Sequence, residues 1–403
     1  MNGLKKFGSK IRIPALSISV ALLVGAIFII FTDIEVLGGL LSDPIGALSL
    51  GIGRAAASYS ALFRGAFGDP ENIGKALASN GDIKLWARAL RPLVESVVAS
   101  VPLIFVGLGV SVAFRTGIFN IGGAGQYTMG AVGGTLAALL FGAGVTPAPI
   151  AILLVMIFGV IGGAAWAFIP GYLKARVGAS EVITTIMLNF IVLAFLNWIV
   201  SAKLHVPETL HTPPIVAGMM PRFADSFAAF RGSAANFTIV FAVLAALASW
   251  WYLFRTRSGY AVRAVGLQPD AAEYGGVRVP RVLLVTMCLS GALAGLGGMN
   301  FVLGYKGYYE EGFAGGAGFL GIAVALVGRN HPFGILGAAL LFATLSQGGL
   351  AVNAVVPKQL TDILTAVVIL AVATAVPEVQ KQLRAAAANV TAAFYRDARK
   401  GVS

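Results

Sequence analysis

The chain has 403 residues, of which 58% are apolar and only 11% are charged. An ordinary soluble domain carries roughly 25% charged residues, so this composition excludes a soluble fold with a normal charged surface. The 51 glycines favour closely packed membrane helices. In a membrane protein, the net charge of +12 is a guide to topology and does not indicate binding to nucleic acid.

Ten apolar segments are candidates for membrane helices, which need about 20 mostly apolar residues. In chain order they comprise residues 14–32, 92–113, 118–141, 148–170, 181–200, 236–254, 282–303, 315–328, 333–351 and 359–376. The third and eighth are the weakest because both are rich in glycine, and the eighth is short for a full crossing. The sequence thus predicts an all-α protein, a polytopic transmembrane helical bundle of about ten spans.

The distribution of charge predicts which way these spans face. With the N-terminus in the cytoplasm, the cytoplasmic segments hold 18 of the 29 basic residues but only 5 of the 17 acids. Loops on the cytoplasmic side of membrane proteins are enriched in Lys and Arg. We therefore expect both termini in the cytoplasm. The first span follows four basic residues and lacks a cleavage site, which indicates a retained anchor helix rather than a signal peptide.

Three regions follow from this layout. Residues 1–91 form the anchor helix and an external amphipathic segment, in which Arg54 and Arg64 lie on the polar side of helices expected at the membrane surface. Residues 92–376 form the membrane core, with a cytoplasmic loop over 255–281. Residues 377–403 form a basic cytoplasmic tail.

The sequence contains no arrangement typical of catalysis or metal binding. Its closest approach to a nucleotide-binding loop, Gly68 to Ala76, has one residue too many between the glycines and lacks the Ser or Thr that binds Mg²⁺. The three histidines do not have metal-ligand spacing. We therefore expect a transport function with no catalytic residue, metal or cofactor in this chain, driven by a partner or by an ion gradient.

A glycine-rich break interrupts the third apolar segment between Phe119 and Gln126. Broken membrane helices expose backbone donors and acceptors that can bind a polar solute. Two interpretations stand: Asn120 and Gln126 line a solute path, or the segment is a tight re-entrant turn in which they satisfy local backbone groups.

Polar residues also recur along the fifth segment. Ser180 suits a helix N-cap and Glu181 suits the positive end of the helix that follows. Glu181, Thr185 and Asn189 then share one helical face, which must meet protein or water rather than lipid. Glu181 either stabilises the N-terminus of this helix or lines a solute path. Asn189 and the isolated Asn300 either line such a path or bond to neighbouring helices.

The loop between the sixth and seventh segments is the most specific feature of the sequence. Pro269 suits the first position of a helix, Asp270 its first turn, and Gly275-Gly276 its end. A helix of two turns or fewer is expected here, flanked by basic residues. Its two neighbouring alanines give a narrow face that fits a groove on another protein; the alternative is an ordinary turn.

Four segments of the sequence resemble those of a known family. Asp270-Ala271-Ala272 followed by Gly276 resembles the E-A-A-x-x-x-G coupling motif of ABC importer permeases, with Asp in place of Glu. The longer string 263–277 resembles more narrowly the permeases of nucleoside importers, which belong with those for ribose and branched-chain amino acids. The same family is also resembled by the segments 114–126, 178–189 and 321–332. The family commonly has Gly-Ala-Glu-Gly-Gln at residues 122–126, and this chain lacks the expected acid at Ala124.

The resemblance implies a permease subunit that moves nucleosides, purines favoured, by alternating access in a bacterial inner membrane. The solute pathway is then expected at Asn120, Gln126, Glu181, Thr185, Asn189 and Asn300. The helix that couples to the ATPase is expected at Asp270, Ala271, Ala272, Glu273, Tyr274, Gly275 and Gly276. The partners implied are a second homologous permease in a heterodimer, a cytoplasmic ABC ATPase that holds ATP and Mg²⁺, an external solute-binding lipoprotein and membrane lipid, without nucleic acid.

Other functions remain as alternatives. One is an ABC permease for a monosaccharide such as ribose, and another is an ion-coupled secondary carrier. A carrier needs buried ionisable residues near the midplane, whereas this sequence places Glu95 and Glu181 near the ends of their spans. A scaffold or interaction protein is the third alternative.

Overall fold

The computed structural model describes residues 19, 22–141, 147–204, 206–209, 211–216, 218–310, 312–313, 316–353, 363, 366 and 367. Over these residues the chain is helical and contains no β-strand, with only two isolated bridges, His211 to Glu310 and Arg222 to Asn236. The prediction of an all-α protein is therefore confirmed. Almost all of the predicted tenth span, the tail 377–403 and the part of the first span before residue 19 lie outside the described residues.

The chain folds as two compact units, one drawn from residues 1–65 and 348–403 and the other from Ala66–Gln347. In the first unit, helix Leu22–Thr32 precedes α2 (Ile34–Gly39) and most of α3 (Pro44–Phe67). Arg54 on α3 pairs with both Asp33 and Glu35, so the polar side predicted for this segment binds α2.

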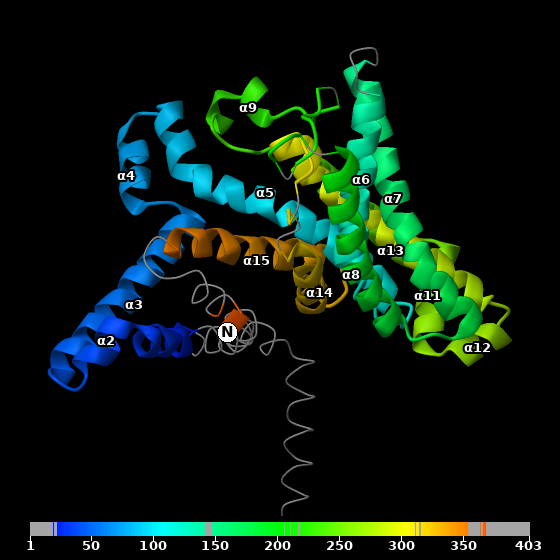
Figure 1. The fold of residues 1–403 in the computed structure, drawn as a ribbon, viewed down its shortest axis with the longest axis horizontal. Coiled ribbons are helices and arrows are strands. Elements are labelled where there is room, and N and C mark those ends of the chain that lie inside the picture. The colour runs from blue at the N-terminus through cyan, green and yellow to red at the C-terminus, as the bar shows by residue number, and fades with distance from the viewer. Residues whose placement is uncertain are drawn as a thin grey trace, which may run out of the picture. The chain divides into compact units, whose positions relative to one another are not determined.

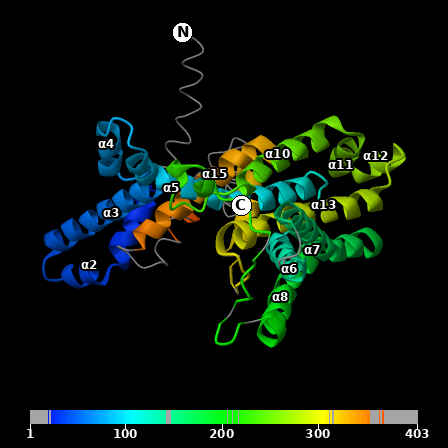
Figure 2. The same ribbon diagram turned by 90° about the horizontal axis from the view of Figure 1, so that it is seen from above.

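The second unit contains the elements that position the candidate site (Figures 1 and 2). In chain order they are α4 (Pro70–Ala78), α5 (Ile83–Phe114), α6 (Gly123–Phe141), α7 (Ala148–Val177), α8 (Glu181–Ile199), the π-helix η1 (Val200–Leu204), α9 (Phe223–Ser226), the 3₁₀ turn η2 (Ala228–Phe230), α10 (Thr238–Arg255), α11 (Arg257–Leu267), α12 (Pro269–Tyr274), α13 (Val279–Met299), the π-helix η3 (Asn300–Lys306), α14 (Ala317–Val327) and α15 (Pro332–Val352), which ends in the first unit.

Six of these described helices are long and apolar enough to cross a membrane: α5, α7, α8 with the start of η1, α10, α13 with most of η3, and α15. The structure thus supports a multi-pass membrane protein, while the count of ten spans stays a prediction. The predicted eighth span is a helix of 11 residues, α14. At 1.5 Å per residue it is about 16 Å long, roughly half of the hydrocarbon core.

The helix that contains the predicted second span begins at Ile83, nine residues before the predicted start of that span at residue 92. The Asp82 carboxylate caps this helix by accepting the Lys84 backbone N–H at 2.8 Å, and Pro92 lies inside the helix. The sequence-based prediction missed this extension of the helix because it followed the apolar run, which basic residues interrupt, and did not use the cap.

Glycines bring α6, α7 and α13 into backbone contact at the centre of this unit. Gly163 of α7 and Gly291 of α13 each leave no space for a Cβ atom because the carbonyl oxygen of the other occupies it. A Cβ on Gly130 of α6 would likewise lie 2.5 Å from the carbonyl oxygen of Gly295. Small residues allow this close approach, which is how membrane helices gain packing energy without a hydrophobic driving force.

Candidate functional site

The predicted break after α5 forms a buried turn held by side-chain amides. Asn120 Oδ1 accepts the backbone N–H of Gly122 at 2.9 Å, and α6 begins one residue later. Asn120 and Gln126 donate to each other at 3.0 and 3.1 Å, and Asn120 Nδ2 also donates to Ser290 Oγ of α13 at 2.8 Å. The turn is therefore fixed to α13, and in this conformation both amides bind protein groups.

Asn189 of α8 clamps the same turn from the other side. Its Oδ1 accepts the backbone N–H of Gly125 at 2.9 Å, and its Nδ2 donates to the Ile121 carbonyl oxygen at 3.0 Å. Thr185, one turn earlier, is fully buried beside Gly122 and donates to the Glu181 carbonyl oxygen at 2.6 Å. The structure thus brings Asn120 and Gln126 together with Thr185 and Asn189 of the predicted helical face, a convergence that the sequence did not predict.

Replacing Asn189 with alanine is expected to loosen this clamp. The buried Gly125 N–H and the Ile121 carbonyl would lose their partners, at about 1–3 kcal/mol for each unsatisfied group. We predict a lower melting temperature of the detergent-solubilised protein together with reduced transport. The matched control is Asn197→Ala on the same helix, where the side chain is exposed and no change is expected; an equal effect of both substitutions would refute the clamp.

Glu181 lies at the edge of this turn, where its carboxylate contacts the backbone of Phe119, directly before Asn120. Its carboxylate pairs with Lys174 at the end of α7 over 2.9 Å, across the turn in which Ser180 caps α8. Gly178 ends α7 in the left-handed conformation, with φ of 69°. In this structure, Glu181 therefore joins the ends of two helices.

Asn300 lies away from this turn, at the start of η3, and binds a backbone carbonyl of α5 that has no partner within its own helix. Pro102 has no backbone N–H, so the Val98 carbonyl four residues earlier lacks its helical partner. Asn300 Nδ2 donates to that carbonyl oxygen at 3.3 Å, and its Oδ1 accepts the Thr238 hydroxyl of α10 at 2.6 Å. This amide consequently links α5, α10 and α13 at one level of the bundle.

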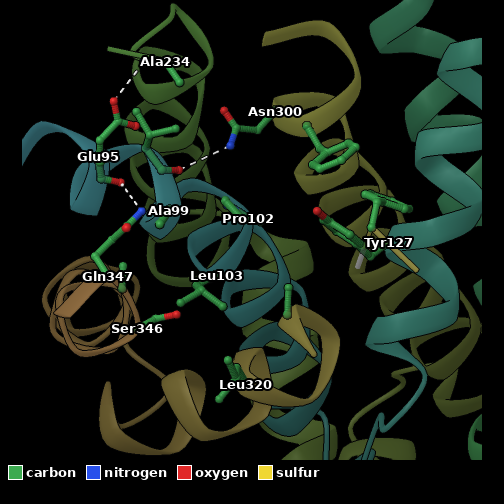
Figure 3. A pocket seen from close by; sticks show the side chains of 15 residues that line it. Glu95, Ala99, Pro102, Leu103, Tyr127, Ala234, Asn300, Leu320, Ser346 and Gln347 are labelled. Carbon is green, nitrogen blue, oxygen red and sulfur yellow. Dashed lines mark hydrogen bonds between the residues drawn. The ribbon is translucent and has the colours of Figure 1, made fainter. Parts of the chain in front are cut away.

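A cavity of about 320 Å³ opens beside Asn300 (Figure 3). Its volume lies at the lower end of the range typical of small-molecule sites. Small and aliphatic side chains from α5, α14 and α15 form much of the wall, and the larger polar and aromatic groups come from five segments: Glu95, Tyr127, Asn300, Phe301, Phe313 and Gln347.

Aromatic rings form one side of this cavity. Tyr127 of α6 stacks on Phe313 with ring centroids 5.1 Å apart and an interplanar angle of 18°. Phe301 and Tyr309 contact the same Phe313 ring at 4.9 and 5.2 Å. Such a cluster offers a rigid surface for a flat, π-rich solute.

Glu95 lies on the opposite side of the cavity, beside α15 (Figure 3). It is the only acid in α5. Its Oε1 accepts the Ala234 backbone N–H at 3.2 Å, and Arg91 lies 3.9 Å from the same oxygen. Gln347 Nε2 donates to the Glu95 carbonyl oxygen at 3.4 Å. The cavity therefore combines Glu95 and Gln347 on one side with aromatic rings on the other (Figure 3).

The cavity and α12 lie at opposite ends of α13. Asn300 directly follows its last residue, while α12 precedes its first. The 21 residues of α13 span about 30 Å, close to the thickness of the hydrocarbon core. The solute-sized cavity therefore lies at one end of α13, and the short helix α12 lies at the other.

The short helix α12 has the extent that the sequence predicted, from Pro269 to Tyr274. Ala272 faces inward, while Asp270, Ala271 and Glu273 are exposed and Tyr274 is 98% exposed. Gly276 ends the segment at φ of 85°, a left-handed conformation that favours glycine.

The loop that carries α12 also contacts the turn after α5. Gly266, near the end of α11, has no space for a Cβ atom because the Arg115 carbonyl oxygen occupies it. Arg115 and Arg263 lie over the Phe254 ring at 5.0 and 5.4 Å, and burial, followed by the charge of Arg263, lowers the pKa of Arg115. A displacement of α11 and α12 would therefore act directly on the turn that contains Asn120.

Sequence reasoning did not identify most of the cavity. In the sequence, Glu95 is recognisable as the only acid in a long apolar helix. Tyr127 directly follows Gln126, which was predicted to line the pathway. Phe313 and Gln347 gave none, because they meet the cavity only through the folding of distant segments.

A multi-pass helical chain with a solute-sized cavity at one end and an exposed short helix at the other has the organisation of a membrane transport subunit. Comparison with known proteins specifies the family. Residues 93–373 match the family described as the permease component of branched-chain amino acid transport systems. The chain belongs to this family of ABC transporter permeases.

Three relatives illustrate the range of this family. The chain is 36% identical over 322 residues to the nucleoside ABC transporter permease protein NupB of Lactococcus lactis subsp. cremoris, covering 78% of this chain and 82% of that protein. It is 33% identical over 378 residues to the guanosine ABC transporter permease protein NupP of Bacillus subtilis, covering 91% and 93%. It is 34% identical over 290 residues to a glucose ABC transporter permease protein of Haloferax volcanii, covering 69% and 75%. No solved structure matches the chain.

Proposed function

We propose that the chain is the permease subunit of an ABC importer that moves nucleosides, purines favoured, across a bacterial inner membrane by alternating access. The names of NupB and NupP support this class of solute. In this assignment, a separate cytoplasmic ATPase holds ATP and Mg²⁺ and hydrolyses ATP, and an external solute-binding lipoprotein delivers the solute.

The observation that carries the proposal is the cavity beside Asn300. A nucleoside joins a flat aromatic base to a sugar with hydroxyl groups. Base stacking on an aromatic ring contributes about 1–3 kcal/mol, and the rings at Tyr127 and Phe313 offer this surface. The side chains of Glu95 and Gln347 offer partners for hydroxyl groups, beside the Asn300 amide that bonds to Val98 and Thr238.

The buried amide network is the second part of the proposed pathway. In this conformation its side chains form hydrogen bonds with other protein groups around the turn after α5. They belong to Asn120, Gln126, Thr185 and Asn189. We propose that they exchange these partners for solute when the path opens towards the cytoplasm, with Glu181 at its margin.

Two alternatives deserve comparison. The Haloferax volcanii relative, whose name specifies glucose, favours a monosaccharide permease. The aromatic wall of the cavity offers stacking to the base of a nucleoside, a group that a monosaccharide lacks. An ion-coupled carrier gains no support, because the relatives with nucleoside, guanosine and glucose in their names are all called ABC transporter permeases.

A second permease is a proposed partner. Lactococcus lactis and Bacillus subtilis each have another related permease protein, NupC at 27% identity and NupQ at 29% identity to this chain. This supports a heterodimer of two homologous permeases, in which α12 of this chain docks on the ATPase and transmits its closure to the membrane helices.

Uptake in cells tests the proposed function. A strain lacking this chain is expected to lose accumulation of radiolabelled guanosine and inosine, and the wild-type chain supplied in trans is expected to restore it. Unlabelled adenosine should compete with guanosine, whereas ribose and glucose should not. Unchanged nucleoside uptake in the deletion strain, together with lost ribose uptake, would replace the nucleoside assignment with the monosaccharide one.

A further inference from the structure

Glu95 is the one acidic side chain among the groups that line the cavity. Its side chain is 24% exposed, and it lies in an apolar helix where an ionisable group is costly without a purpose. Only Oε1 is engaged, by the Ala234 N–H at 3.2 Å, with Arg91 at 3.9 Å. Oε2 has no hydrogen-bond partner within the part of the chain that the structure describes.

The position of this carboxylate across from the aromatic rings matches the two ends of a nucleoside. Figure 3 shows Glu95 and Tyr127 on opposite sides of the cavity. A base stacked against the rings at Tyr127 and Phe313 would point its sugar towards α5. The adjacent 2′ and 3′ hydroxyls of a ribose form a pair of donors, and an ionised carboxylate is an acceptor with several lone-pair sites.

We propose that Glu95 binds the 2′,3′-diol of the solute, so that the permease itself selects ribonucleosides over 2′-deoxyribonucleosides. This inference rests on the proposed nucleoside transport. Hydrogen bonds to a charged group are roughly twice as strong as neutral ones, and a site built to bind a hydroxyl discriminates strongly against an analogue that lacks it. Glu95 thereby adds a second selection after that of the external binding protein.

The test compares uptake of guanosine and 2′-deoxyguanosine by cells carrying wild-type chain or Glu95→Gln, each with its native partners. The glutamine keeps an acceptor for the Ala234 N–H but loses the charge. We expect guanosine uptake to fall about tenfold while 2′-deoxyguanosine uptake changes less than about threefold. Because the external binding protein is unchanged, the altered ratio is assigned to the permease.

Glu71→Gln is the matched control, since that exposed acid on α4 pairs with Lys75 one turn away, and the ratio should stay at the wild-type value. Glu95→Asp keeps the charge but withdraws it by one methylene, and the same fall in the ratio is expected should the glutamine variant assemble poorly. Equal losses for both solutes in both Glu95 variants would overturn the proposal. Failure of the wild-type chain to support any nucleoside uptake would instead overturn the proposed function.

Discussion

Replacing Gly130 with alanine is expected to abolish assembly of the membrane core. The new Cβ atom would lie 2.5 Å from the Gly295 carbonyl oxygen and closer still to the Gly295 Cα atom. Both are backbone atoms, so α6 and α13 would have to separate, and overpacking of this kind costs about 1–3 kcal/mol or more. Separation would also remove contacts among three helices, because Gly159 and Gly163 of α7 pack at the same crossing.

The measurement is the yield and melting temperature of the protein extracted in mild detergent. Gly130→Ala and Gly163→Ala should both give little monodisperse protein. Gly337→Ala is the control, because a Cβ atom on this exposed helical glycine of α15 meets nothing within 4 Å. Alanine is the better helix former by about 1 kcal/mol, so this variant should be at least as stable as wild type. Wild-type behaviour of Gly130→Ala would mean that the crossing is not formed as described.

Replacing Tyr274 with alanine is expected to uncouple transport from ATP hydrolysis without affecting the fold. The ring is 98% exposed at the end of α12, so its removal leaves no cavity within the chain. Exposed tyrosines that anchor an interface typically contribute about 2 kcal/mol or more to binding, which corresponds to a loss of more than tenfold in affinity. We therefore predict a fall of at least about tenfold in ATP-dependent uptake.

Copurification of the ATPase with the solubilised permease measures this effect directly. Tyr274→Ala should retain the wild-type melting temperature of the permease alone but recover less ATPase. Leu41→Ala removes an equally exposed apolar side chain, 97% exposed in the first unit, and should change neither quantity. Glu273→Arg, which reverses the charge on the exposed side of α12, should also uncouple uptake. Full ATPase recovery and uptake with both α12 variants would show that the coupling surface lies elsewhere.

Local signals in the sequence were sufficient for several elements. Pro269 and the glycine pair after Tyr274 predicted α12, Pro332 begins α15, and Ser180 caps α8. The glycine-rich segment from Phe119 to Gln126 indicated the break before α6, although α6 already begins at Gly123 within that segment. These predictions succeeded because the features depend on the backbone preferences of single residues and their near neighbours.

Features that depend on packing between distant segments were harder to predict. Asn300 is isolated in the sequence, yet it meets a carbonyl that Pro102 leaves unpaired 202 residues away, at Val98. The cavity takes Glu95 from α5, Tyr127 from α6 and Gln347 from α15. No periodicity within one helix shows that these residues converge, because their proximity is set by how the helices cross.

The alanine at position 124 also gains an explanation from packing. Gly318 of α14 lies so close that a Cβ on it would overlap the Cα and Cβ atoms of Ala124. The small side chain at 124 therefore lies at a close approach of α6 and α14. This close approach accommodates the small side chain of alanine.

Nucleoside transport driven by ATP can be measured as uptake by proteoliposomes that contain the chain, its partner permease and the ATPase, with ATP on the ATPase side and guanosine-loaded binding protein on the other. We expect guanosine accumulation that requires ATP, persists with an uncoupler and falls about tenfold with Glu95→Gln. Accumulation that continues without ATP but stops with an uncoupler, or turnover stimulated by ribose alone, would contradict this expectation.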